Sequence, residues 1–260
     1  LEDRCRNIDS LLCIGIDPRA GSAGEARTAA LDLIAATAPY AAAFKPNAAF
    51  FEALGPDGME ALIEVIAAVP DEIPVILDAK RGDIASTAEA YARACFEVFG
   101  AGSVTLSPYL GRDAVDPFLA YPDRGVWVLC RTSNPSAAVL QDRRLEGGDT
   151  VVEAVAREAA SWAGPDRLGL VAGATAPEAM AAVRAQAPEH WILAPGVGAQ
   201  GAAADAIGAG LRDDGRGVLV PVFRSVAEAA DPAAAARDLR DRLRRVTPAA
   251  PVRAGFSTAT

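Results

Sequence analysis

The sequence predicts an α/β protein of the (β/α)8 class, a TIM barrel, that forms a single domain. Three observations predict this fold. Short apolar runs alternate along the chain with alanine-rich stretches of helical pattern, and eight such pairs occur. The runs are apolar at successive positions, which is typical of strands buried on both faces of a parallel sheet. The length of 260 residues is that of one barrel.

Four strand–helix pairs account for the first half of the chain. Pro46 ends the second apolar run, because proline has no N–H to donate to a sheet. The pair Gly55-Pro56 breaks the helical pattern that follows this run. The predicted strands are 11–17, 42–47, 74–80 and 103–108, and the helical segments are 25–37, a region ending near 69, 84–99 and 113–119.

Four more pairs account for the second half. One helix begins with Pro177, since proline is favoured in the first turn. The predicted strands are 126–132, 168–174, 191–196 and 218–224, and the helices are 150–162, 177–186, 200–209 and 233–245. The barrel domain therefore covers 1–246. The Pro/Ala/Thr-rich tail 247–260 is expected to fray.

Two features of this pattern leave alternatives open. An open doubly wound sheet is the second choice of fold, but it usually has a glycine fingerprint after the first strand, and GIDPRAG at 15–21 is not one. The segment 133–148 has no clear periodicity, which is unusual inside a compact domain. It is either a lid over the site or a disordered insertion, and its position at the barrel mouth favours a lid.

Composition excludes several classes of protein. Hydrophobic residues make up 51% and charged residues 23%, which indicates a globular chain. The net charge of -9 argues against binding to nucleic acid or to an anionic membrane. No apolar run approaches the roughly 18 residues of a membrane span. We expect a cytoplasmic protein, because residues 1–10 lack the apolar stretch of a secretion signal.

Cysteine and histidine usage bears on metal sites and disulfides. The four cysteines are widely spaced, which predicts reduced thiols and not a disulfide framework or a zinc site. The single histidine, His190, cannot form a His-rich metal site, and we expect it at the surface or at a strand edge. No metal is therefore predicted.

Only two lysines occur among 25 basic residues, Lys45 and Lys80. Both fall at the predicted carboxyl ends of strands, where barrel enzymes carry their chemistry. Survival of two lysines by chance is the alternative, but chance does not explain why both lie at strand ends. Lysine differs from arginine in being a compact ammonium that can give up its proton.

The motif DAKRGDI at 78–84 has the densest charge pattern. Residues two apart on a strand point the same way, so Asp78 and Lys80 are expected to face one space. With Lys45 and Asp83 they would form an alternating array suited to protonating a carbanion. A structural ion pair, with Asp83 as a helix cap, is the alternative. However, a buried charged pair is costly unless it is used.

A phosphate site is predicted where strands seven and eight end. The run APGVGAQG at 194–201 lets backbone N–H groups approach an anion, and Arg224 at the end of the next strand can clamp it. An ordinary glycine-rich turn beside a surface arginine is the alternative.

These motifs together resemble one enzyme family. DAKRGDI, with LCIGIDPR at 12–19, FKPNAAFFE at 44–52, SPYLG at 107–111, RTSNPS at 131–136 and APGVGAQG, resembles orotidine 5′-phosphate decarboxylases, most closely the longer bacterial subgroup with the DAKRGDI signature. The resemblance implies a TIM barrel and conversion of orotidine 5′-phosphate to uridine 5′-phosphate and CO2, the last step of de novo pyrimidine synthesis. It further implies no cofactor and a homodimer with sites at the interface.

The resemblance also implies a role for each matching residue. Lys80 protonates C6 of the pyrimidine, Asp78 lies against the substrate carboxylate, and Lys45 and Asp83 complete the array, with Asp83 coming from the partner subunit. Other positions bind substrate. Asp17 and Lys45 bind the ribose, and Ile84 and Thr87 enter the partner's site. Ser133 binds the pyrimidine edge, Pro195 and Val197 line its apolar side, and Gln200 and Arg224 hold the phosphate.

Other functions remain to be compared. A magnesium-dependent phosphosugar decarboxylase or synthase on the same barrel shares the DxKxxD element. A Schiff-base lyase would need a Lys80 of lowered pKa, whereas flanking aspartates raise it. A catalytically dead phosphate-binding barrel would be expected to have a broken charge array, but all four charged residues are present.

Overall fold

The computed structural model describes residues 1–198 and 202–246. Within these residues eight parallel strands form one sheet, in the order β2-β1-β8-β7-β6-β5-β4-β3. Bridges from Phe44 to Val75 and from Asn47 to Asp78 join β2 to β3, so the sheet is a nearly closed barrel. The strands are β1 Leu12–Ile16, β2 Ala43–Pro46, β3 Ile76–Arg81, β4 Ser103–Leu106, β5 Gly125–Arg131, β6 Leu168–Ala172, β7 Trp191–Leu193 and β8 Val218–Val222. The predicted (β/α)8 fold and the position of every predicted strand are confirmed.

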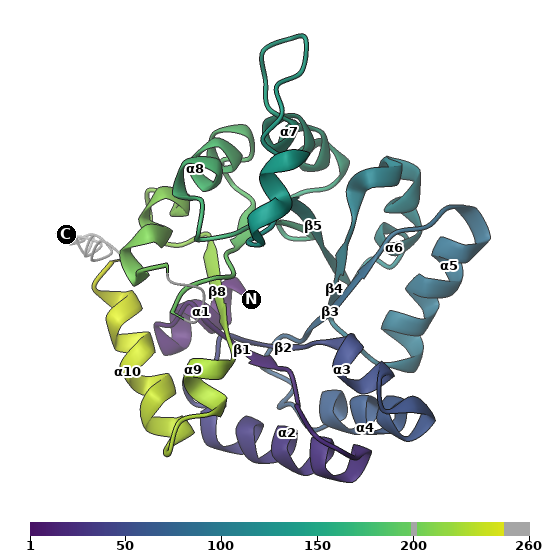
Figure 1. The fold of residues 1–260 in the computed structure, drawn as a ribbon, viewed down its shortest axis with the longest axis vertical. Coiled ribbons are helices and arrows are strands. Elements are labelled where there is room, and N and C mark those ends of the chain that lie inside the picture. Colours follow the sequence, from purple (N-terminus) through teal and green to yellow (C-terminus); the bar gives the residue numbers. More distant parts are fainter. Residues whose placement is uncertain (199–201, 247–260) are drawn as a thin grey trace, which may run out of the picture.

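Helices surround the strands as an outer ring (Figure 1). Several begin at the residues that favour helix starts: Ser22 caps α2, Asp231 caps α10, and Thr150 with Glu153 forms a capping box on α7. The helices are α1 Glu2–Ile8, α2 Ala23–Thr37, α3 Ala48–Glu52, α4 Gly55–Ala67, α5 Ala85–Arg93, α6 Asp116–Leu119, α7 Val151–Trp162, α8 Pro177–Gln186, α9 Arg224–Ala227 and α10 Pro232–Arg244.

Three helical segments differ from the prediction. The helix predicted at 200–209 is a 3-10 segment, Ala204–Gly210, because its glycines disfavour a longer α-helix. The helix at 113–119 begins only at Asp116, because Pro117 is tolerated in a first turn but not in a helix interior. The helix at 84–99 ends in a π-helical turn, Ala94–Val98.

The N-terminal segment forms a helix that the sequence reading did not predict. Arg4 of α1 donates to the carbonyls of Ala38 and Ala41, just before β2, and Cys5 is buried. Glu2 pairs with Arg212, which precedes β8. Helix α1 therefore lies against the amino-terminal ends of the strands, opposite to the end at which the strands lead into their helices.

The described residues include all four cysteines, and each is buried and free, as expected of reduced thiols. The sequence predicts His190 at the surface or at a strand edge. It directly precedes β7, but it is only 7% exposed and so is not a surface residue. The described chain contains no helix of sufficient length and apolar character to cross a membrane.

Candidate active site

A cavity of about 280 Å³ opens at the carboxyl ends of the strands. This is the end of a barrel where chemistry is found. Residues from all eight strands or from the loops that follow them line it. The predicted site residues that line it are Asp17, Lys45, Asp78, Lys80, Ser133, Pro195, Val197 and Arg224.

Three charged side chains meet at the base of this cavity. Lys45 Nζ donates to Asp78 Oδ2 at 2.7 Å, and Lys80 Nζ donates to Asp78 Oδ1 at 2.5 Å. The side chains of Lys45 and Asp78 are each 11% exposed, whereas that of Lys80 is 52% exposed. The arrangement leaves one ammonium buried and one accessible, both on the same carboxylate.

The electrostatics keep Asp78 and Lys45 ionised. Burial by itself would raise the pKa of Asp78, but Lys45 and Lys80 outweigh it and hold that pKa well below its ordinary value. Burial would likewise lower the pKa of Lys45, and the carboxylates of Asp78 and Asp17 raise it instead. Asp78 is therefore an anion, and Lys45 a cation, at neutral pH.

Strand β3 is irregular where it carries these charges. Its pairing with β4 shifts between Leu77 and Arg81, and Lys80 has a φ of 47°, in the left-handed region that non-glycine residues rarely adopt. Such a residue costs about 1–3 kcal/mol. Asp78 and Lys80 face the same cavity, as the alternation predicts, but they do so through a bulge and not through a regular strand.

Asp17, which follows β1, can accept a further hydrogen bond. Its Oδ1 is buried and has no hydrogen-bond partner among the described residues. Burial is the main cause that raises the pKa of Asp17, and Lys45 opposes it. A buried acceptor on a cavity wall fits a ligand that brings its own donor, such as a hydroxyl.

The structure does not bring every predicted residue into this cavity. Asp83, Ile84 and Thr87 are not among its lining residues, and Ile84 is 53% exposed. The helix-cap alternative for Asp83 is wrong, because α5 begins after Ile84 without a side-chain cap. The carboxylate of Asp83 accepts instead from the N–H of Ile84. Gln200 lies outside the described residues.

The opposite rim of the cavity is suited to an anion. Gly196 and Gly198 have φ values of 113° and 78°, which glycine alone adopts without strain. Arg224 lines the same rim, but it begins α9 and does not end β8, which stops at Val222. Ser225 follows it into the cavity. This rim follows β7 and β8, whereas the lysines lie on β2 and β3.

The segment 133–148 is hydrogen-bonded and contains a 3-10 helix, Pro135–Val139. Arg131 donates to both carboxylate oxygens of Asp142, at 2.7 and 3.0 Å. Gln141 accepts from the N–H of Thr132 at 2.8 Å. These contacts fix the start of the segment, where Thr132 and Ser133 line the cavity.

Sequence reasoning assigned no role to five polar or charged residues of the cavity: Arg19, Asn47, Thr105, Thr132 and Ser225. Thr105 could have been found, because it is a polar residue between the apolar Val104 and Leu106 in a strand that is buried on both faces. Asn47 could have been found as the residue after the lysine strand. Among the described residues, no group of three or more His, Cys, Asp and Glu side chains is placed to hold a metal ion.

Comparison with known proteins places the chain in a family. Residues 10–239 match the model of the "Orotidine 5'-phosphate decarboxylase / HUMPS family". The orotidine 5′-phosphate decarboxylases of Roseiflexus castenholzii and an Azoarcus species are 47% and 46% identical to it. The first alignment covers 90% of this chain and 91% of that protein, and the second covers 88% and 90%.

Solved structures agree with this placement. The orotidine monophosphate decarboxylase of Leishmania donovani superposes with a TM-score of 0.88 and 49% identity, over 94% of this chain and 97% of that one. The UMP synthase of the same organism gives a TM-score of 0.91 and 51% identity over 94% of this chain, which matches 55% of that longer protein. The chain belongs to the orotidine 5′-phosphate decarboxylase / HUMPS family.

Proposed function

We propose that this protein converts orotidine 5′-phosphate to uridine 5′-phosphate and CO2, the last step of de novo pyrimidine synthesis, without a metal or an organic cofactor. The observation that carries the proposal is the cluster of Lys45, Asp78 and Lys80 at the base of a cavity, in a chain of this family. The magnesium-dependent phosphosugar reaction stays the alternative that the experiment below tests.

The proposed chemistry breaks one carbon–carbon bond and forms one carbon–hydrogen bond. The C6–carboxylate bond of the pyrimidine breaks heterolytically, CO2 leaves, and the electron pair stays on C6. Lys80 Nζ delivers a proton to C6 and regains one from water, since its side chain is half-exposed. Enzymes lower such barriers by roughly 8–23 kcal/mol, mainly through charges placed in advance.

Asp78 and Lys45 act before the proton is transferred. The ionised Asp78 lies against the substrate carboxylate, so the negative charge lost with CO2 relieves a repulsion between the two groups. The Lys45 ammonium, at 2.7 Å from Asp78, keeps that carboxylate charged and in place. The array therefore favours the state that follows loss of CO2, because the substrate carboxylate no longer lies beside the Asp78 carboxylate.

The rest of the substrate fits the remaining walls. Asp17 and Lys45 would bind ribose hydroxyls, which supply the donor that the buried Asp17 Oδ1 lacks among the described residues. Ser133 would meet the pyrimidine edge, with Pro195 and Val197 on its apolar side. Arg224, joined by Gln200, would hold the phosphate on the glycine rim. Phosphate binding would then close the segment 133–148 as a lid.

We also propose that the protein is a cytoplasmic homodimer in which Asp83, Ile84 and Thr87 complete the partner's site. None of the three lines the cavity of its own chain. Apolar side chains are exposed on the same side of the barrel, after β3 and β4: Ile84, Tyr109 and Leu110, at 53%, 81% and 45%. A second copy would cover them.

The test is the loss of the ultraviolet absorbance of orotidine 5′-phosphate on mixing with the purified protein in excess EDTA, beside the Lys80→Ala variant. We expect rapid loss with the wild type and almost none with the variant. No turnover by either protein, with or without EDTA, refutes the proposal. That outcome favours the magnesium-dependent phosphosugar alternative. Turnover that EDTA abolishes refutes the cofactor-free reaction, and equal turnover by both proteins removes Lys80 from its role.

A further inference from the structure

Thr105 on β4 stands alone opposite three residues of β3. The two strands pair at Leu77 with Val104 and again at Arg81 with Leu106. Between these pairs, β3 contains Asp78, Ala79 and Lys80, and β4 contains only Thr105. Neighbouring strands normally match residue for residue, so the extra residues of β3 have backbone groups that the regular ladder does not pair.

The Thr105 hydroxyl takes the place of the missing ladder partners. Its Oγ1 accepts from the N–H of Ala79 and from the N–H of Lys80, each at 3.0 Å, and donates to Asp78 Oδ1 at 3.0 Å. A hydroxyl has one hydrogen and two lone pairs. Because both lone pairs are used by the amides, the hydrogen can point only to Asp78.

Burial makes this arrangement hard to replace. Thr105 is 2% exposed, so water cannot readily supply the same acceptor and donor. The left-handed φ of Lys80, 47°, occurs at one of the two amides that the hydroxyl binds. The oxygen of Asp78 that it binds is also the one that accepts from Lys80 Nζ. The Thr105 side chain thus contacts both the backbone of Lys80 and Asp78, the carboxylate that pairs with the Lys80 ammonium.

We propose that Thr105 is a positioning residue for the decarboxylation. It holds the backbone of Lys80 in the conformation that directs the ammonium into the cavity, and it fixes the rotation of the Asp78 carboxylate. It acts through these two residues and transfers no proton itself. The inference rests on the proposed function, because it concerns the geometry of the same reaction.

The experiment compares the isosteric Thr105→Val, which removes the hydroxyl, with Thr105→Ser, which keeps it. We expect Thr105→Val to lower kcat about 100-fold, the effect of a small misplacement of a reacting group. KM should change by less than about threefold, because the walls that bind ribose and phosphate are untouched. Thr105→Ser should keep kcat within about fivefold, since the hydroxyl is retained.

Thr37→Val is the matched control. Thr37 is also fully buried, and its hydroxyl donates to the carbonyl of Leu33 at 2.7 Å, but it lies at the end of α2, outside the cavity. The Thr37→Val variant should be less stable than the wild type, because it loses a buried hydrogen bond, but it should keep the wild-type kcat. The thermal midpoint of each variant separates a loss of folded protein from a loss of turnover.

Each outcome has a defined meaning. Wild-type protein that does not decarboxylate the substrate refutes the proposed function itself. Active wild type with an equally active Thr105→Val overturns the inference, as does equal impairment of the valine and serine variants. If Thr105→Val does not fold, Thr105→Cys replaces it, because a thiol is a weak donor and acceptor. The expected result is then the same fall in kcat, and wild-type kcat overturns the inference.

Discussion

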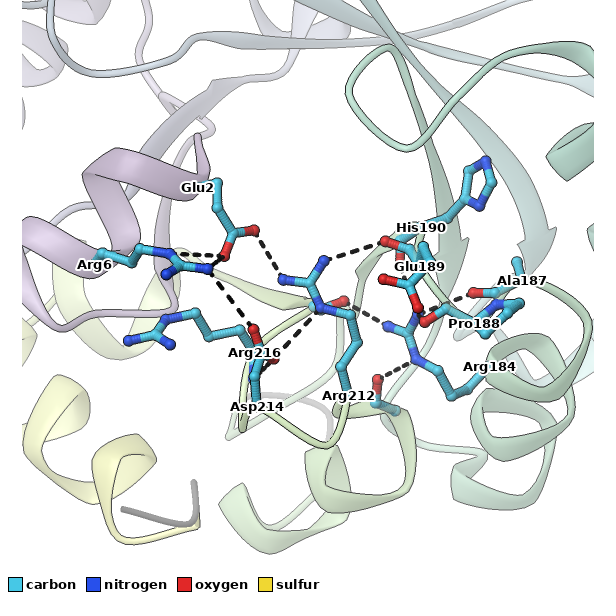
Figure 2. A network of polar contacts seen from close by, with 12 residues as sticks. Glu2, Arg6, Arg184, Ala187, Pro188, Glu189, His190, Arg212, Asp214 and Arg216 are labelled. Carbon is cyan, nitrogen blue, oxygen red and sulfur yellow. Dashed lines mark hydrogen bonds and ion pairs between the residues drawn. The ribbon is translucent and has the colours of Figure 1, made fainter. Parts of the chain in front are cut away.

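The two ends of the barrel each carry a cluster of charged residues, but the two clusters differ in what their charged groups contact. At the carboxyl end, Lys45 and Lys80 both pair with Asp78, and all three residues line a cavity. At the amino end, Arg184 and Arg212 bind groups of the chain itself (Figure 2). The lysines and Asp78 of the first cluster line the cavity that holds most of the predicted site residues, whereas Arg184 and Arg212 bind carbonyl and carboxylate groups of the fold.

Arg184 shows how the amino end uses charge. Within the described chain it donates to the carbonyls of five residues: Ala187, Pro188, His190, Gly210 and Gly217. Burial, with the nearby Arg212, lowers the pKa of Arg184 to about 10, which leaves it charged at neutral pH. One side chain thus joins the loops that precede β7 and β8.

Arg212 connects this region to α1. It donates to Glu2 Oε2 at 2.8 Å and lies 3.5 Å from Asp214. Its guanidinium carbon lies over the ring of Trp191, 5.3 Å from the ring centre. Figure 2 shows Glu2 between Arg6 and Arg212. Charge at this end stabilises the fold, and charge at the other end is available for chemistry. Exchanging arginine and lysine between the two ends tests this difference.

The largest effect is expected for Lys80→Arg. The guanidinium keeps the positive charge beside Asp78 but does not give up a proton at neutral pH. Loss of a general acid costs about 10²–10⁴-fold in kcat. Steady-state turnover of orotidine 5′-phosphate measures this, with the unfolding midpoint as the control. Wild-type kcat in the variant would show that charge alone suffices at this position.

Asp78→Asn should lower both activity and stability. It leaves the buried Lys45 ammonium without its carboxylate, and breaking a buried pair costs about 3–5 kcal/mol. The folded-state pKa of Asp78 is depressed below 3.8, so the unfolded chain binds more protons as the pH falls. Its stabilisation is therefore complete above about pH 5 and is lost as the pH falls toward the folded pKa.

Urea unfolding of wild type and Asp78→Asn at pH 7 and pH 3 measures this dependence. The difference in the free energy of unfolding between wild type and Asp78→Asn should be smaller at pH 3 than at pH 7. Asp149→Asn is the control, since its ion pair with Arg157 is exposed and contributes less than about 1 kcal/mol. A gap of the same size at both pH values would mean that the Asp78 carboxylate does not carry the acid sensitivity.

Arg184→Lys is the counterpart at the amino end. An ammonium has three donors and cannot reach five carbonyls, so some of them lose their partner at about 1–3 kcal/mol each. We expect the free energy of unfolding to fall by about 2–4 kcal/mol. The kcat per folded molecule should stay at the wild-type value, measured below the unfolding transition. A fall in kcat would show that the two ends are coupled.

Glu2→Gln should have the smallest effect. Glu2 is 32% exposed, and its pairs with Arg6 and Arg212 are partly screened by water. We expect a loss below about 1 kcal/mol and unchanged turnover. Chemical denaturation in low and high salt measures it, because salt should reduce the loss. A loss as large as that of Arg184→Lys would mean that α1 is essential to the amino end.

The strands and the charged motif were predictable because their signals are local. A run such as 218–222 is apolar at each position, and a strand buried on both faces needs nothing more. Asp78 and Lys80 are two residues apart, so their shared direction follows from strand geometry. The helix at 200–209 was misread as regular, since alanine content alone does not outweigh glycines within a short segment.

The sequence by itself determined the barrel, its strand positions and the placement of both lysines at strand ends, because apolar periodicity and residue spacing act within a few positions of the chain. Only the tertiary structure decided that Thr105 meets the amides of Ala79 and Lys80, that Asp17 has a buried oxygen on the cavity wall, and that α1 lies against the amino end. These contacts join residues far apart in the chain. They depend on how one strand aligns with the next, which no local pattern encodes.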